Sequence, residues 1–414
     1  MMGKAWRFHG IRSGIVTTFL VIATVFGVAI RNQILEDRAR TAAKNVEEQN
    51  RIQAVGLVNA LLTAETSRVP GIILAIDKGQ YRRWADVILK AALESEEDSS
   101  PAKLHASMAL LLVDETQVDY LVNQLLALKL NDLSTVRDAL IPHKEQVVGP
   151  LWNVLNDETE ESNRRFRAAC ALAAYTRARG PHEDIFTRAF RAAQAIRKNE
   201  QRWHRENKQH RAGHSALPFV ARHMVMSLNI SRRDFDLVVK VLEPWAKELV
   251  KPLSDILRDN TRRESERDMA LSIYLEYAFD NPNLLAAVLT DGDDRQFAAV
   301  LSHAERLSDE VGENSLLHKL ANRLEVLARS RFLAKAGNLS EKEKESIAKR
   351  KAAIAVALLK FGRSHMVWPL LKQSPDNRTR TYIIHWAAPR GVDPSIFVAR
   401  YDDEPDVSIR QALL

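Results

Sequence analysis

Three arginines and a cysteine stand close together in the stretch NRRFRAACALAAYTR, residues 163–177. Arg164, Arg165 and Arg167 could bind an anion, and Cys170 could act as a nucleophile beside it. The stretch is otherwise mostly alanine, which favours a second interpretation, a thin helix face against which another helix packs closely. Cys170 is then a small buried apolar residue. Because it is the only cysteine, it also excludes an intrachain disulfide and a multi-cysteine zinc site.

Histidines offer the other candidate chemistry. His210 and His214 are four residues apart, a spacing found among metal ligands on one helix face. We expect Gly213 to interrupt that helix, and nearby basic side chains would repel a cation. The sequence HRENKQH also departs from the H-E-x-x-H zinc motif. No Ser-His-Asp set, phosphate-binding loop or dinucleotide fingerprint is recognisable, so we predict no metal, no cofactor and no enzymatic activity.

A basic run carries almost all of the net charge. The run amounts to +6 of the chain's +7, after Glu200 and Glu206 are subtracted, and it includes Trp203. One interpretation is a patch for an anionic partner, such as lipid headgroups, an acidic protein or nucleic acid, of which nucleic acid is the least expected. The other, which we favour, is a solvated loop between blocks of helices. The basic residues are Arg188, Arg191, Arg197, Lys198, Arg202, Arg205, Lys208 and Arg211.

The composition points to helices. The chain has 414 residues, 46% of them apolar, with only 15 glycines and 14 prolines. A β-sandwich or barrel needs many tight turns, so this scarcity favours an all-α fold. Charged residues of both signs are interspersed, as on solvated helix faces rather than in disordered segments.

An uncharged run of 18 residues, 13–30, follows a short basic tail, 1–12. That length is about the minimum for a membrane-spanning helix. We predict a permanent transmembrane anchor, with a cleaved signal peptide and a buried core helix as the alternatives. Basic residues flank both sides, so their count does not fix the orientation, although a large C-terminal body favours an extracytoplasmic location. Residues 31–55 are then a helical stalk, part of a long helix from Ile34 to Glu65 whose apolar stripe is formed by Ile34, Val46, Ile52, Val55 and Leu62.

The pattern of the opening stretch recurs along the chain. A basic residue, a helix of small and apolar residues, a turn and a second amphipathic helix repeat with a period near 30 residues. Such a period is typical of a helical solenoid, in which stacked helix pairs share a core. The arginines of the opening stretch therefore belong to a repeat, and we expect each basic marker to lie at the start or inner rim of its helix and to pair with an acid such as Asp114 or Asp157. The markers are Lys103, Arg137, Arg167, Arg267, Lys351, Arg380 and Arg410.

The repeats fall into two blocks. The first covers residues 56–190 and the second residues 266–414, with the basic loop and irregular helices of 191–265 between them. Within the second block, Ser340 precedes Glu341 and Glu343, which predicts an N-cap and an acidic first turn.

Several stretches resemble one protein family. The repeats are similar to HEAT repeats, and KLHASMALLLVDETQVDYLVNQLL (103–126), RRFRAACALAAY (164–175) and VWPLLKQSPDNRTRTYIIHWAAPRG (367–391) are among those that carry a narrower resemblance. They resemble the region of large bacterial membrane proteins that follows a serine/threonine kinase domain and a transmembrane helix and leads into a formylglycine-generating-enzyme-like (sulfatase-modifying factor) domain. The resemblance covers residues 46–414.

Two departures limit what that resemblance implies. The glycine-rich loop, H-R-D loop and D-F-G motif of a kinase are absent, and the sequence ends at Leu414 inside a repeat helix. No catalytic residue can be carried over, and we expect a shortened or split relative of that family.

The sequence thus predicts a membrane-anchored, non-catalytic helical solenoid that binds another protein as a scaffold or sensor-like module. One alternative is the non-catalytic part of a kinase or sulfatase-modifying-factor-like signalling protein that acts with a separate catalytic chain. A second is a solenoid that binds nucleic acid. Large side chains suited to a protein contact are Trp152, Trp245, Trp368 and Trp386.

Overall fold

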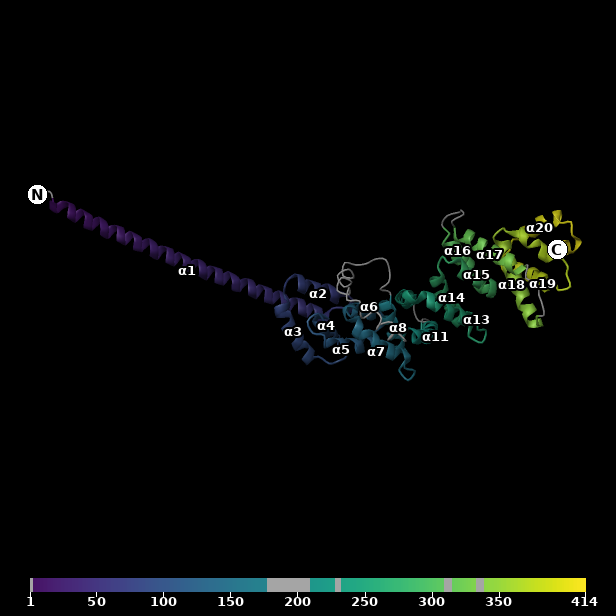
Figure 1. The fold of residues 1–414 in the computed structure, drawn as a ribbon, viewed down its shortest axis with the longest axis horizontal. Coiled ribbons are helices and arrows are strands. Elements are labelled where there is room, and N and C mark those ends of the chain that lie inside the picture. Colours follow the sequence, from purple (N-terminus) through teal and green to yellow (C-terminus); the bar gives the residue numbers. More distant parts are fainter. Residues whose placement is uncertain (1–2, 177–208, 228–231, 309–314, 333–338) are drawn as a thin grey trace, which may run out of the picture. The chain divides into compact units, whose positions relative to one another are not determined.

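The computed structural model describes residues 3–176, 209–227, 232–308, 315–332 and 339–414, and only the backbone of 3–30, 176, 209–215, 232–233 and 331–332. Across these described ranges the chain is all-α and contains no strand, as predicted, and the arrangement fits a helical solenoid (Figure 1). The helices group into two compact units, Met1–Val147 and Val148–Leu414. That boundary falls inside the predicted first block, and the predicted division at 190 and 266 stays a prediction because residues 177–208 lie outside the described part.

The first unit begins with one continuous helix, α1 (Gly3–Thr63), which includes the predicted tail, anchor and stalk. Only its last turns pack, through Ala54, Val58 and Leu61, which are fully buried. These turns contact α2, α3 and α4. The stripe predicted for the stalk is wrong in register, since Ile52 is 60% exposed and Val55 37% exposed. The packed face lies on neighbouring positions, and residues 31–49, N-terminal to it, are exposed, although Glu47 still pairs with Arg83 of α3 at 3.5 Å.

The remaining helices of the first unit are short and pack in sequence order. The pairs α3–α4, α4–α5 and α5–α6 are in contact. Every residue from Leu104 to Leu110 of α4 is buried, so α4 is the centre of this unit. The elements are η1 (Thr66–Arg68), α2 (Val69–Lys78), α3 (Arg82–Ser95), α4 (Pro101–Leu110), α5 (Gln117–Leu125), α6 (Leu130–Ala139) and η2 (Ile141–His143), followed by α7 (Lys144–Asn156), which runs across the boundary between the units.

The second unit stacks helices in the way that solenoids do. Sequence neighbours α13–α14, α17–α18 and α18–α19 are packed together, and so are the more distant pairs α11–α13, α14–α16 and α15–α18. The elements are α8 (Ser162–Thr176), α11 (Gln209–Ser227), α12 (Arg232–Leu242), η3 (Glu243–Trp245), α13 (Ala246–Arg258), α14 (Glu264–Ala278), α15 (Pro282–Asp291), α16 (Asp294–Arg306), α17 (Leu316–Phe332), α18 (Glu341–Lys360), η4 (Ser364–Met366), η5 (Trp368–Leu371), α19 (Arg378–Ala387), α20 (Pro394–Asp403) and α21 (Val407–Leu413).

Alanine-rich helices occupy the middle of the second unit. In α18 every residue from Ala352 to Leu359 is buried, and in α8 every residue from Ala168 to Ala173 is buried. Small side chains let the neighbouring helix backbones approach closely while still excluding water. The alanines of the opening stretch therefore form core, as the repeat interpretation predicts.

Local hydrogen bonds begin several of these helices. The Ser340 hydroxyl and the Glu343 side chain form a reciprocal capping box at the start of α18, which confirms the predicted N-cap. Two of the basic markers pair with acids as predicted, Lys103 with Asp98 at 2.6 Å and Arg267 with Asp293 at 3.2 Å, while the two acids given as examples bind nearby threonines. The Asp114 carboxylate accepts hydrogen bonds from the backbone and hydroxyl of Thr116 at 3.1 and 2.6 Å, and Asp157 does the same with Thr159 at 2.9 and 2.7 Å.

The predicted anchor cannot be tested by side-chain packing. Residues 13–30 form part of α1, but their side chains lie outside the described residues. Among the residues that the structure describes fully, no helix combines the length and the apolar character needed to cross a membrane.

Candidate protein-binding surface

A column of aromatic and cationic side chains follows one face of α19. Tyr382 and Trp386 are four residues apart on α19 and point the same way, and Arg390 follows in the turn after α19 ends at Ala387. The Tyr382 and Trp386 ring centres are 4.9 Å apart, and the Arg390 guanidinium lies 4.5 Å from the Trp386 ring centre. Lys349 of α18 extends the column, with its Nζ 5.3 Å from the Tyr382 ring centre. These contacts alternate charge and ring faces, which is the favourable cation–π geometry.

The inner end of the column is buried. The Arg390 side chain is 3% exposed and lies between the Trp386 ring and the Phe297 ring of α16, whose centre is 4.8 Å away. Its Nε donates to Asp294 at 2.9 Å and its Nη2 donates to the carbonyl of Gly292 at 3.4 Å. Arg390 therefore joins the C-terminal end of α19 to the first turn of α16, about one hundred residues earlier.

The turn that receives Arg390 is acidic and binds arginines from several helices. Asp291 pairs with Arg258 of α13 at 3.1 Å and with Arg350 of α18 at 2.9 Å. Asp293 caps α16 through the Gln296 N–H at 2.9 Å and pairs with Arg267 of α14 at 3.2 Å. The turn thus caps α16 and also ties four parts of the second unit together through Arg258, Arg267, Arg350 and Arg390.

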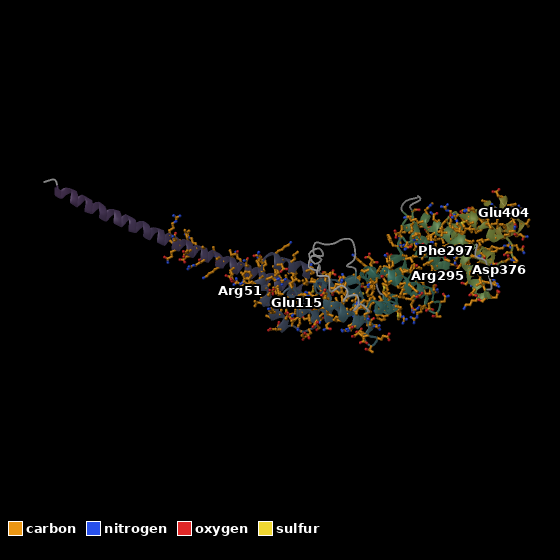
Figure 2. All side chains as sticks on the ribbon, in the orientation of Figure 1. Arg51, Glu115, Arg295, Phe297, Asp376 and Glu404 are labelled. Atoms are coloured by element: carbon orange, nitrogen blue, oxygen red, sulfur yellow. The ribbon has the colours of Figure 1, made fainter. Side chains whose placement is uncertain are left out.

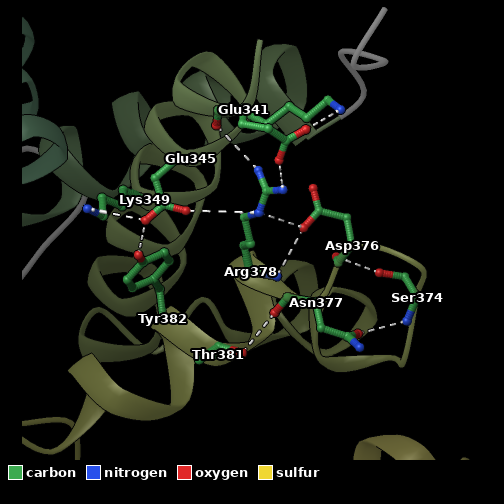
Figure 3. A network of polar contacts seen from close by, with 10 residues as sticks. Glu341, Glu345, Lys349, Ser374, Asp376, Asn377, Arg378, Thr381 and Tyr382 are labelled. Carbon is green, nitrogen blue, oxygen red and sulfur yellow. Dashed lines mark hydrogen bonds and ion pairs between the residues drawn. The ribbon is translucent and has the colours of Figure 1, made fainter. Parts of the chain in front are cut away.

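The outer end of the column is exposed and polar (Figure 3). Arg378, at the start of α19, forms a close ion pair with Glu341 of α18 and lies 3.5 Å from Asp376. The Tyr382 hydroxyl donates a short hydrogen bond to Glu345, which pairs with Lys349 at 3.3 Å. The Tyr382 hydrogen bond lowers the pKa of Glu345 and raises that of Tyr382, so Glu345 stays charged and Tyr382 stays protonated at neutral pH.

This outer surface has the composition of a protein contact. Tyr382 and Trp386 are half-buried, so each ring is held in place yet keeps an accessible edge. Beside them, His385, three residues after Tyr382, is also exposed. Tyrosine, tryptophan and arginine dominate the energetics of protein interfaces because they supply large area at little conformational cost. We call Arg378, Tyr382, His385 and Trp386 the α19 surface.

The other three tryptophans named from the sequence are buried. Trp152 and Trp245 stack on one another with ring centres 5.9 Å apart, and they are only 7% and 8% exposed. Trp368 is 9% exposed and packs edge-on against Phe397 at 6.2 Å. Of the four tryptophans named as candidate contacts, Trp386 is the one accessible enough to take part in binding. The other three are core residues and not contact residues, because they are buried.

Two shallow hollows lie on the described surface of the chain, apart from the α19 surface. One, of about 470 Å³, lies beside Trp368, Lys372, Arg400 and Asp406 at the end of the second unit. The other, of about 440 Å³, lies between α1 and α3 in the first unit. Both are wide open to solvent, unlike the enclosed, mainly apolar clefts that hold small molecules.

The basic markers have varied positions. Lys103, Arg267, Arg380 and Arg410 lie in the first turn or so of their helices, as expected, but Arg137 lies in the last turn of α6 and Lys351 in the middle of α18. Lys103 pairs with Asp98 at 2.6 Å, and Arg380 and Arg410 donate to the backbone carbonyls of Ser408 and Glu404. Lys103, like Arg267 with Asp293, thus pairs with an acid, whereas Arg380 and Arg410 bind backbone carbonyls.

The opening arginines do not form an anion site with the cysteine. Arg165 donates to the Leu155 carbonyl at 3.0 Å and lies over the Phe219 ring at 4.1 Å, and Arg164 pairs with Glu160 at 3.0 Å. Cys170 is fully buried, as the repeat interpretation predicts. Arg167 lies in α8, and burial, with a smaller contribution from the charge of Arg167, lowers the pKa of His223.

The predicted anionic-partner patch is not described in full. Its residues from Arg188 to Lys208 lie outside the described residues, and Arg211 belongs to α11 with its side chain undescribed. Gly213 does not interrupt the helix as expected, because α11 runs from Gln209 to Ser227. The side chains of His210 and His214 also lie outside the description, and among the described residues no group of three or more histidine, cysteine or acidic side chains could hold a metal ion.

Comparison with known proteins assigns no family. A scan of the chain against models of protein families finds no match. A search of curated proteins likewise finds no significant match.

Proposed function

We propose that this chain is a membrane-anchored, non-catalytic helical-repeat protein that binds another protein through the second unit. The observation that carries the proposal is the α19 surface, where accessible edges of Tyr382 and Trp386 stand on a rigid base. That base is the buried Arg390 joint to α16. Side chains that are already ordered lose little entropy on binding, so they suit a contact of useful affinity.

The finer parts of the proposal rest on the sequence. The uncharged run 13–30 has the length of a membrane span, and the same helix leads directly into the stalk. We place the run in the cell membrane and the packed units outside the cytoplasm. The HEAT-like resemblance adds that such repeats present extended surfaces to protein partners.

Site-specific photo-crosslinking tests the binding surface. A photoreactive residue replaces His385 in one full-length variant and Val398, 63% exposed on α20, in a matched control. We expect the first to form a discrete adduct in the producing cells and the second to form none at that mass. Identical adducts at both positions would contradict a contact at α19.

A second pair of variants measures how much the Tyr382 ring contributes to binding of the partner. Tyr382→Ala in the His385 probe variant should reduce the adduct about ten-fold or more, whereas Tyr382→Phe, which keeps the ring, should reduce it far less. Circular dichroism confirms that both variants are folded. If the captured chain is a kinase or a sulfatase-modifying-factor-like protein, the scaffold acts with a separate catalytic chain, and nucleic-acid binding would instead appear as salt-sensitive retention on DNA.

A further inference from the structure

The stalk part of α1 is uncovered. Every residue from 31 to 49 is exposed, on all faces of the helix, and their side chains stand free in Figure 2. Near the C-terminal end of this stretch Glu47 pairs with Arg83 of α3 at 3.5 Å, but even there the stalk residues stay exposed. A lone helix in water gains little from its own hydrogen bonds, because most helix stability in proteins comes from packing of one face. An uncovered helix of this length therefore calls for a partner.

The stalk has one self-complementary face. Two-stranded coiled coils repeat core positions a and d every seven residues, and seven registers are available. Six of them place a charged side chain in the core between residues 32 and 49. The remaining register, which we call the stalk seam, contains Asn32, Ala39 and Val46 at a and Leu35, Ala42 and Gln49 at d.

The stalk seam contains a polar core residue of the kind that favours a dimer in one register. A single asparagine at an a position, here Asn32, favours two strands in register at some cost in stability. Small residues at Ala39 and Ala42 allow the two helices to approach closely.

The flanking charges favour a parallel pair. In the seam register Arg31 is at g and Glu36 is at the following e, which face one another across a parallel dimer. The dimer's symmetry supplies this attraction twice. An antiparallel pair would instead bring the two g rows together, and these rows contain Arg31 and Arg38. Glu36 also pairs within its own helix with Arg40 at 3.8 Å, but both side chains are about 70% exposed, and such pairs are weak.

The hollow in the first unit lies at the C-terminal end of the seam. Ala42 and Val46 line it together with Trp84 of α3, and its volume is about 440 Å³. Arg83 closes one side through its pair with Glu47 at 3.5 Å. A second helix along the seam would cover this hollow and place apolar surface against the Trp84 ring, which adds to the area that dimerisation removes from water.

We infer that the chain forms a parallel homodimer through the stalk seam. The occupant of the uncovered face is the same face of a second copy. This inference is independent of the partner proposed for the second unit, because it concerns a different surface.

Disulfide trapping of the full-length chain tests the dimer. In a Cys170→Ala background, Ala42→Cys places a thiol in the seam, and Lys44→Cys, at the outward f position of the same helix turn, is the control. Under mild oxidation we expect the Ala42→Cys chain to crosslink about ten times faster than the control, because thiols held face to face react as an intramolecular pair. Equal rates, or no crosslinking at either position, would overturn the inference.

A second set of variants tests the parallel orientation of the two helices and the role of the flanking charges. A mixture of Leu35→Cys and Gln49→Cys chains should form like-with-like disulfides if the pair is parallel, and mixed disulfides would show an antiparallel pair. Arg31→Glu should slow trapping at position 42, and adding Glu36→Arg should restore it. Light scattering of the unmodified chain should give a protein mass of twice the 46.8 kDa chain mass. A monomeric mass, with a seam cysteine that is protected from reaction, would overturn the dimer and mean that another segment covers the face.

Discussion

At the scale of single residues, His105 is a titratable side chain buried inside the first unit. It is 1% exposed in the centre of α4. Its Nδ1 donates to the Leu61 carbonyl at 3.0 Å, and the Thr66 hydroxyl lies 3.2 Å from Nε2, which fixes the neutral tautomer. Burial lowers the pKa of His105, and the opposing effects of the backbone of Leu61 and the charge of Asp132 are smaller.

This lowered pKa makes the first unit sensitive to acid. Below about pH 6.5 the unfolded chain takes up a proton at His105 that the folded chain refuses, so the free energy of unfolding falls as pH decreases. At pH 8 the effect is absent, because both states are neutral. His105→Asn, whose amide can still donate to Leu61, should flatten the decline. Urea unfolding of both proteins at pH 7.5 and 5.5 measures it, and an equally steep decline in the variant would contradict the assignment.

Between elements, the joint from α19 to α16 shows how distant repeats are connected. Arg390 binds Asp294 and lies between the rings of Trp386 and Phe297. It closes a loop of nearly one hundred residues with one side chain. Because the guanidinium is buried, the contact is little screened by salt.

Removing this side chain should loosen the second unit. Arg390→Ala leaves a cavity between two rings and an unpaired Asp294, and we expect a loss of about 3 kcal/mol in the free energy of unfolding. The control is Arg329→Ala, whose side chain is 68% exposed and pairs only with Glu325, four residues away on the same helix. That change should cost less than about 0.5 kcal/mol. Denaturant unfolding compares them, and similar losses would argue against a special role for Arg390.

Local patterns predicted the elements better than they predicted the contacts. The capping box at Ser340 and the alanine core of α8 depend on residues a few positions apart, and both could be foreseen. An acidic partner could be foreseen for Lys103 and Arg267, but which acid it would be could not, and Asp114 and Asp157 bind the threonine two residues later. The spacing of Tyr382, Trp386 and Arg390 in the sequence indicated part of the α19 column. The ion pair between Arg390 and Asp294 could not be predicted, because it depends on where α16 lies relative to α19. In α1, apolar residues were too evenly spread to show which face packs.

For the whole molecule, the described helices form two units, with α1 leading into the first and the α19 surface in the second. Each proposed task thus belongs to a separate part: attachment to residues 13–30, self-association to the stalk, and protein binding to α19. Separate parts can be altered independently, which makes each proposal testable in an otherwise intact chain.

Attachment gives the prediction at this scale. The full chain should remain in the membrane pellet after alkaline extraction, and deletion of residues 1–30 should release it into the soluble fraction. A tag after Leu414 should be removed by protease added to intact cells if the units lie outside the cytoplasm. A soluble chain shortened by about 29 residues would instead indicate a cleaved signal peptide.

With residues 13–30 in a membrane, as proposed, the uncovered length of α1 would set the distance from the bilayer to the first packed helices. Nineteen exposed residues, 31–49, rise about 1.5 Å each, which gives a spacer of up to about 30 Å. At physiological ionic strength electrostatic forces decay over about 8 Å, so the charge of the lipid headgroups would hardly reach the helices at the end of this spacer. A partner of those helices would then have to extend a few nanometres from the membrane itself or arrive from solution.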